Sequence, residues 1–221
     1  MAGEHDNARR LFLSWVGAGA IAASATATAS AAGAAQAPGG GNRPWQPAHH
    51  PQDDWLDQLP GTHRFVIDTT TPAGFENALL YVGNYFTANA SGYGLTDKDL
   101  AVVIVARHDS TPFAYTDSMW AKYGPSLALR SGSVDPTKRP PATNLYRQRV
   151  DNLIARGVHL AVCQMATRRL ATTIADANGG KVDDVYAELT ANLFANAHMV
   201  QAGIVAVNRA QERGYSFAHA V

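Results

Sequence analysis

Cys163 is the only cysteine of the 221-residue chain, and Arg168 and Arg169 follow it five and six residues later. The thiolate is the reactive form of cysteine, and helix N-termini and neighbouring cations favour it. Two arginines in the first turn of a helix oppose the helix dipole, so they favour an anion nearby. Alternatively, the thiol packs as a small apolar side chain, and the arginines pair with acidic residues of a neighbouring helix. Those acidic residues are Asp183, Asp184 and Glu188.

Four more polar residues follow apolar segments and are candidates for the same site. Arg107 and His108 lie near the end of the run 99–109, and His108 is a candidate to orient or deprotonate the thiol. Asn208 and Arg209 are expected to open the last helix, where backbone N–H groups hold anions. Asn208 is equally well explained as an N-cap. We predict Cys163 and His108 as catalytic residues, and Arg107, Arg168, Asn208 and Arg209 as ligands of an anion or substrate.

Three other histidines, His49, His50 and His159, favour roles outside catalysis. His159 lies within an apolar run and is expected to be a core histidine with a hydrogen-bond partner. The pair His49 and His50 has no carboxylate or third histidine at a ligand spacing in the sequence, and exposed histidine pairs are usually solvated. The sequence therefore predicts no metal site.

Alternating apolar and amphipathic segments predict the elements that carry these residues. Strands are expected at 63–70, 99–109, 158–166, 199–207 and 215–221. Helices are expected at 72–90, 144–157, 167–180, 181–197 and 208–214, the third with Thr167 as its N-cap. This order predicts an α/β domain with a mostly parallel sheet of about five strands and helices on both faces. Ligand sites in such sheets lie at the carboxyl ends of the strands, where the candidate residues fall.

The N-terminal segment has the composition of an export signal. Arg9 and Arg10 precede a short Ala- and Gly-rich apolar run, as in a twin-arginine signal, and small residues follow as a cleavage motif. We predict a signal at 1–37, a Pro- and Gly-rich arm at 38–62 and a domain at 63–221. The mature protein is expected to be periplasmic or otherwise exported, without stable insertion in a membrane.

Composition and missing motifs exclude several functions. The formal net charge is zero and no basic run occurs, so the sequence predicts no nucleic-acid partner. The glycine-rich phosphate-binding motifs and the common cysteine and histidine motifs of redox, haem and zinc sites are absent. No cofactor is therefore predicted, and a single cysteine cannot form an internal disulfide.

The stretch 155–170 resembles the DsrE/DsrF-like family of sulfur-relay proteins, in whose active members such a strand ends in the cysteine that carries persulfide sulfur. The segments 75–86, 100–108, 112–124 and 203–215 resemble the exported branch of that family. The resemblance implies a flavodoxin-like fold, a three-layer sandwich. It also implies a homo-oligomer, a trimer or hexamer, and a sulfur donor or acceptor protein as partner. Of the candidate residues, only Cys163 is matched by the resemblance.

Two main functional hypotheses follow, beside a third, a purely structural subunit in a larger exported complex. The first is an exported sulfur carrier or sulfurtransferase that uses a persulfide on Cys163. The second is a non-catalytic, oligomeric module that binds a small ligand or a metal and in which Cys163 is structural.

Overall fold

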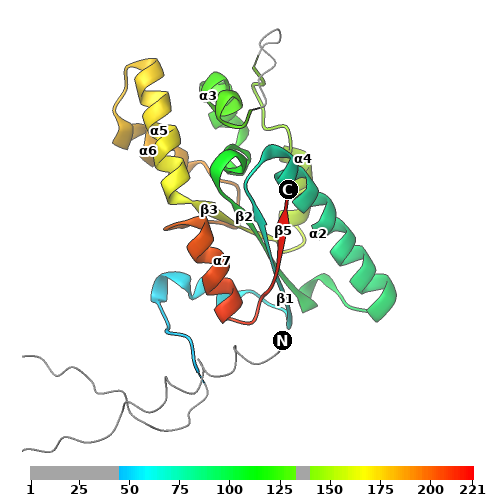
Figure 1. Cartoon of the computed structure of the whole chain (residues 1–221). Coiled ribbons are helices and arrows are strands. Elements are labelled where there is room, and N and C mark those ends of the chain that lie inside the picture. The colour runs from blue at the N-terminus through cyan, green and yellow to red at the C-terminus, as the bar shows by residue number, and fades with distance from the viewer. Residues whose placement is uncertain (1–44, 133–139) are drawn as a thin grey trace, which may run out of the picture. The chain divides into compact units, whose positions relative to one another are not determined.

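The structure, a computed structural model, describes residues 45–132 and 140–221. Trp45–Val221 form one compact unit (Figure 1). The signal predicted at 1–37 lies outside the described residues, as does the first part of the arm. No helix in the described ranges has the length and apolar character needed to cross a lipid bilayer.

A single sheet of five parallel strands runs through the unit in the order β4-β3-β2-β1-β5 (Figure 1). The strands are β1 (His63–Thr69), β2 (Leu100–Ala106), β3 (His159–Cys163), β4 (Ala197–Val200) and β5 (Ser216–Ala220). All seven residues of β2 are buried, because parallel strands in the middle of such a sheet are covered on both faces. The sheet confirms the predicted α/β class and the three-layer, flavodoxin-like sandwich.

Helices cover both faces of this sheet. The α-helices are α1 (Trp55–Gln58), α2 (Pro72–Tyr93), α3 (Asp117–Arg130), α4 (Arg147–Ile154), α5 (Gln164–Asn178), α6 (Val182–Ala191) and α7 (Gly203–Glu212). Short 3-10 helices are η1 (Pro51–Asp53), η2 (Asp97–Asp99) and η3 (His108–Ala114). Apolar residues of α2 to α6 form one core with the sheet, and those of α1 and α7 form a second core on the other face. Part of the predicted arm thus belongs to the folded unit.

The connection between the last two strands creates a switch point in the sheet. The chain passes through β1, β2, β3 and β4 in turn and then crosses the whole sheet to β5. Because crossovers between parallel strands are right-handed, this reversal places α7 on the face opposite α2 to α6. β3 therefore leads to a helix on one face and β4 to a helix on the other. Such a point is where open α/β sheets place their ligand site.

The strand predicted at 199–207 is wrong in its second half. β4 ends at Val200, and α7 begins at Gly203. A short apolar run with β-branched residues is compatible with a buried strand or a buried helix, and periodicity alone does not separate them. In the fold, Ala206, Val207 and Ala210 recur at helical spacing and are buried against the sheet.

Candidate functional site

Cys163 lies where β3 passes directly into α5. It is the last residue of the strand and the N-cap of the helix, and 7% of its surface is exposed. The predicted helix start at Thr167 is wrong by three residues, since α5 begins at Gln164. Thr167 instead donates a hydrogen bond from Oγ1 to the carbonyl oxygen of Cys163 at 3.0 Å, and Tyr115 Oη lies 2.8 Å from the same hydroxyl. Buried hydrogen bonds thus hold the backbone of Cys163 in place.

A cavity of about 110 Å³ opens beside Cys163 at the switch point between β3 and β4. Arg107 and His108 line it from the end of β2, and Arg169 lines it from α5. Ala202 and Gly203 line it from the start of α7. The cysteine is therefore largely buried, but it borders an internal space that a small ligand can enter.

Two helices begin at this cavity. Cys163 is the N-cap of α5 and Ala202 is the N-cap of α7, and neither helix start receives a side-chain capping bond from the residues that the structure describes. The first N–H groups of a helix carry partial positive charge and lack partners within the helix. Both helix starts therefore favour an anion in the cavity, including a thiolate on Cys163.

Arg107 contributes a fixed positive charge to the cavity wall. Its Nε and Nη2 donate hydrogen bonds of 2.7 Å to the two carboxylate oxygens of Asp68, which is 2% exposed. These hydrogen bonds to Asp68 raise the pKa of Arg107. A Cβ at position 203 would lie 2.8 Å from Cβ and Cδ of Arg107, so only glycine leaves room for this side chain.

His108 and Arg169 complete the polar part of the cavity. His108 has φ of +53°, an uncommon backbone angle for a residue other than glycine, at the turn from β2 into η3. Arg169 has no ion pair within residues 45–132 and 140–221. Arg169 is not among the residues that the sequence predicts as ligands. It follows Ala166, which also lines the cavity, by three residues, so the two lie on the same face of α5. This spacing indicates Arg169 only when the start of the helix is known.

Arg168 points to a neighbouring helix instead of to the cavity. Its Nη1 lies 3.1 Å from Oδ1 of Asp183, and its guanidinium lies 4.0 Å from the ring centroid of Tyr186. Both partners belong to α6. The structure thus separates Arg168 from Cys163 and agrees with the alternative that this arginine pairs with an acidic residue.

Asn208 and Arg209 also lie apart from Cys163. Both fall inside α7 rather than at its start, because the helix begins five residues before Asn208. The prediction that they open a helix is therefore wrong. Arg209 pairs with Glu212 and borders a second cavity of about 150 Å³, formed with His50 and other residues near the start of the described chain.

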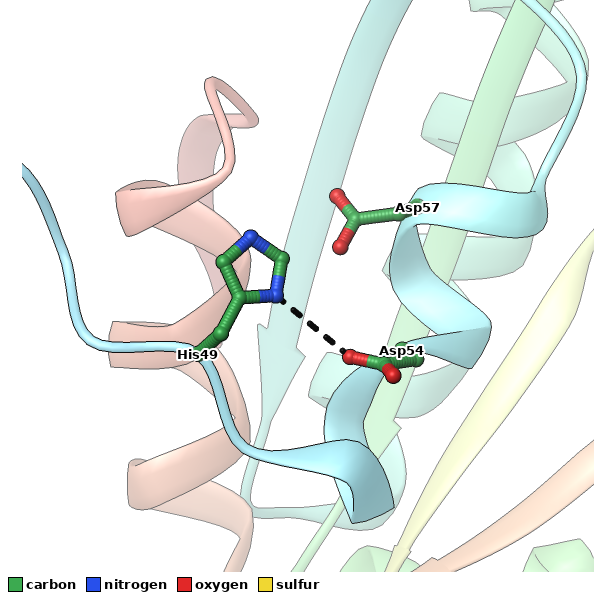
Figure 2. Close-up of side chains that lie close together, drawn as sticks. All are labelled: His49, Asp54 and Asp57. Carbon is green, nitrogen blue, oxygen red and sulfur yellow. Dashed lines mark ion pairs between the residues drawn. The ribbon is translucent and has the colours of Figure 1, made fainter.

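Folding brings His49 close to two carboxylates that are not adjacent to it in the sequence. Figure 2 shows His49, Asp54 and Asp57 facing one another, and one ligand atom from each lies within 4.8 Å of the others. Two carboxylates thus lie within ligand reach of His49, although the sequence predicts no metal site. However, Asp57 already pairs with Arg213 at 3.0 Å and lies 3.9 Å from Arg64. Both arginines contact Asp57, whereas Asp54 lies 3.5 Å from Nδ1 of His49.

His159 has the hydrogen-bond partner that the sequence analysis expects, and it lies at the first position of β3. Its Nδ1 lies 2.8 Å from Nε2 of His198 on β4, and Trp55 stacks on His198 with ring centroids 3.9 Å apart. Burial lowers the pKa of His159. Burial and the nearby charge of His159 lower the pKa of His198 to about 4. Both rings are therefore neutral near pH 7.

Comparison with known proteins leaves the family unassigned. No family model and no curated protein matches the chain. One similar solved structure is that of a protein of unknown function from Methanobacterium thermoautotrophicum. It is 16% identical, with a TM-score of 0.41, and the match covers 71% of this chain and 98% of that one.

Proposed function

We propose that the protein is a sulfur carrier or sulfurtransferase that holds sulfur as a persulfide on Cys163. The observation that carries this proposal is the position of the only cysteine, at a small cavity where two helices begin and two arginines reach the wall. The resemblance to sulfur-relay proteins in the sequence around Cys163 supports the same function. The proposal places the protein outside the cytoplasm and in a homo-oligomer, as the predicted signal and the resemblance imply.

The chemistry requires two thiol exchange steps. In the first, the Cys163 thiolate attacks the outer sulfur of a persulfide or polysulfide donor, so that a new S–S bond forms and the donor leaves as a thiolate. In the second, an acceptor thiolate attacks the outer sulfur on Cys163, and the Cys163 thiolate is released. No net oxidation or reduction occurs, because one S–S bond forms and one breaks in each step.

The site residues support these steps by stabilising negative charge. The starts of α5 and α7 favour the thiolate before attack and the persulfide anion after it. Arg107 and Arg169 add positive charge at the wall, and we assign to His108, which also lines the cavity, the exchange of a proton with an incoming donor. A volume of about 110 Å³ holds roughly three or four water-sized groups, enough for the outer sulfur and the end of a donor.

Intact-mass measurement after exposure to polysulfide tests the proposal. We expect the native protein to gain the mass of one or more sulfur atoms, to lose it on reduction, and to show no gain in the Cys163→Ser variant. A wild-type protein that gains no sulfur would contradict the proposal. If the native thiol is also inert to a small alkylating reagent, the result favours the ligand-binding module with a structural cysteine.

A further inference from the structure

A row of four polar residues crosses four neighbouring strands at the carboxyl edge of the sheet. His219 is on β5, Asp68 is on β1, Arg107 directly follows β2, and Cys163 ends β3. Asp68 is paired in register with His219, and the register of β2 with β3 continues to Arg107 opposite Cys163. The residues two positions earlier on β1, β2 and β3 lie in the core under α7; they are Val66, Val105 and Ala161. Because side chains alternate along a strand, the row lies on this same face.

Direct contacts join the first three members of the row. Nδ1 of His219 lies 3.1 Å from Oδ2 of Asp68, and the same oxygen accepts a hydrogen bond of 2.7 Å from Nη2 of Arg107. Oδ1 of Asp68 accepts a second bond of 2.7 Å, from Nε of Arg107. Buried Asp68 is therefore shared between a half-buried arginine and a histidine that is open to solvent.

The protonation state of His219 decides the net charge of this group. With a neutral imidazole, Asp68 and Arg107 cancel, and Cys163 is next to a neutral pair. With an imidazolium, the three side chains carry a net charge of one positive unit. Arg107 borders the same cavity as Cys163, and its Nη1 has no hydrogen-bond partner in the described part of the chain. The added charge therefore acts on the space where an anion on Cys163 would lie.

We propose that His219 is a positioning residue for Cys163, which acts through Asp68 and Arg107: protonation of His219 stabilises an anion on Cys163, and loss of the proton weakens that stabilisation. This inference rests on the proposed function, because it assigns a role to His219 in the chemistry of the thiol. It adds a residue from the last strand, which the sequence analysis did not connect with the site.

Few other charged groups face His219. Asp68 faces it from β1, and Arg107 lies behind Asp68. The first six residues of α7, 203–208, contain no charged side chain, and neither do the other residues of β5. Asp68 is therefore the charged group that contacts His219 among the residues that the structure describes.

The pH profile of Cys163 alkylation by iodoacetamide tests the inference. In the wild type, the logarithm of the rate is expected to rise with pH and then to lag by about twofold as His219 loses its proton, because a unit charge three strands away from the thiol is removed. The variant His219→Asn keeps a donor for Asp68 but cannot take up a proton, so its profile should rise without the lag. The matched control His63→Asn removes an exposed histidine at the opposite end of β1 and should retain the lag.

Two results would overturn the inference: a wild-type profile without the lag, or the same lag in His219→Asn. If the reagent does not reach the thiol, protein labelled with ¹³C at the cysteine Cβ reports the ionisation directly, since the chain gives a single cysteine signal. The proposed function is tested separately by sulfur loading. If Cys163 gains sulfur but its alkylation profile shows no lag, only the role of His219 is rejected. If the lag is present but Cys163 gains no sulfur, only the sulfur-carrier function is rejected.

Discussion

The side chains at the two ends of β3, Cys163 and His159, point to the same face of the sheet, but their surroundings differ. At its carboxyl end, Cys163 borders a cavity with arginines and two helix starts. At its amino end, four residues earlier, His159 is hydrogen bonded to His198, on which Trp55 stacks. The first region holds charge and open space. The second holds neutral rings in close contact.

The contrast shows that the position of a residue in the fold decides its chemistry more than its type. Histidine is the residue most often used for proton transfer near neutral pH. Yet His159 and His198 lie where burial lowers the pKa of each and where Trp55 occupies the space above the ring of His198. Cys163 lies where α5 and α7 direct their N-termini, which favours an anion. The carboxyl end of β3 is thus the end that the α/β topology leaves open.

Filling the space at the carboxyl end of β3 is expected to have the largest effect on the free energy of unfolding. In Gly203→Ala, the new Cβ would lie 2.8 Å from Arg107 and 3.1 Å from Cγ1 of Val105. We expect a loss of about 1–3 kcal/mol in the free energy of unfolding, measured by urea denaturation, together with slower alkylation of Cys163.

The matched control for this substitution is Gly83→Ala in α2, where a Cβ meets nothing within 4 Å. This variant should gain about 0.5–1 kcal/mol, because alanine favours a helix more than glycine does. Equal effects of the two substitutions would show that the space around Arg107 is not tight.

Lowering the pH is expected to reduce the stability that the two histidines at the amino end of β3 contribute. The pKa values of His159 and His198 are lower in the folded protein than in the unfolded chain, so the unfolded chain binds more protons below about pH 6.5. Their contribution to stability is complete above pH 6.5 and is lost as the pH falls toward 4. Between pH 7 and 5 we expect a loss of about 1–2 kcal/mol, discounted because both rings are partly exposed to solvent.

The variant His198→Phe identifies the source of that loss. Phenylalanine can still stack on Trp55 but cannot bind a proton, so the stability of the variant should change less between pH 7 and 5 than that of the wild type. Urea denaturation at the two pH values measures the difference. An unchanged dependence on pH would show that these histidines are not the groups responsible.

Removing one arginine at a time is expected to have the smallest effect. Arg169 borders the cavity and Arg168 pairs with α6. We expect Arg169→Gln to lower the alkylation rate of Cys163 with anionic iodoacetate, relative to neutral iodoacetamide, by about threefold. Arg168→Gln should leave this ratio unchanged, and both variants should unfold within about 0.5 kcal/mol of the wild type. A larger effect from Arg168 would place the anion on the other side of α5.

Local patterns in the sequence predict most of the sheet but only part of the site. The predicted strands around Ile67, Ile104 and Val162 match β1, β2 and β3, because continuous apolar runs are typical of buried parallel strands. Cys163, Arg107 and His108, three of the candidate residues, line one cavity. Arg169 lines the cavity in place of Arg168, in a helix whose N-cap is Cys163, four residues before the predicted N-cap Thr167.

The sequence by itself determines an α/β chain in which its only cysteine ends a strand just before a helix. It does so because strand and helix periodicities and the cysteine count are local properties. Only the tertiary structure decides that His219, Asp68 and Arg107 form one connected group. It also decides that α7 opens at the cavity of Cys163. These relations depend on the order and register of strands far apart in the sequence, and no local pattern contains that information.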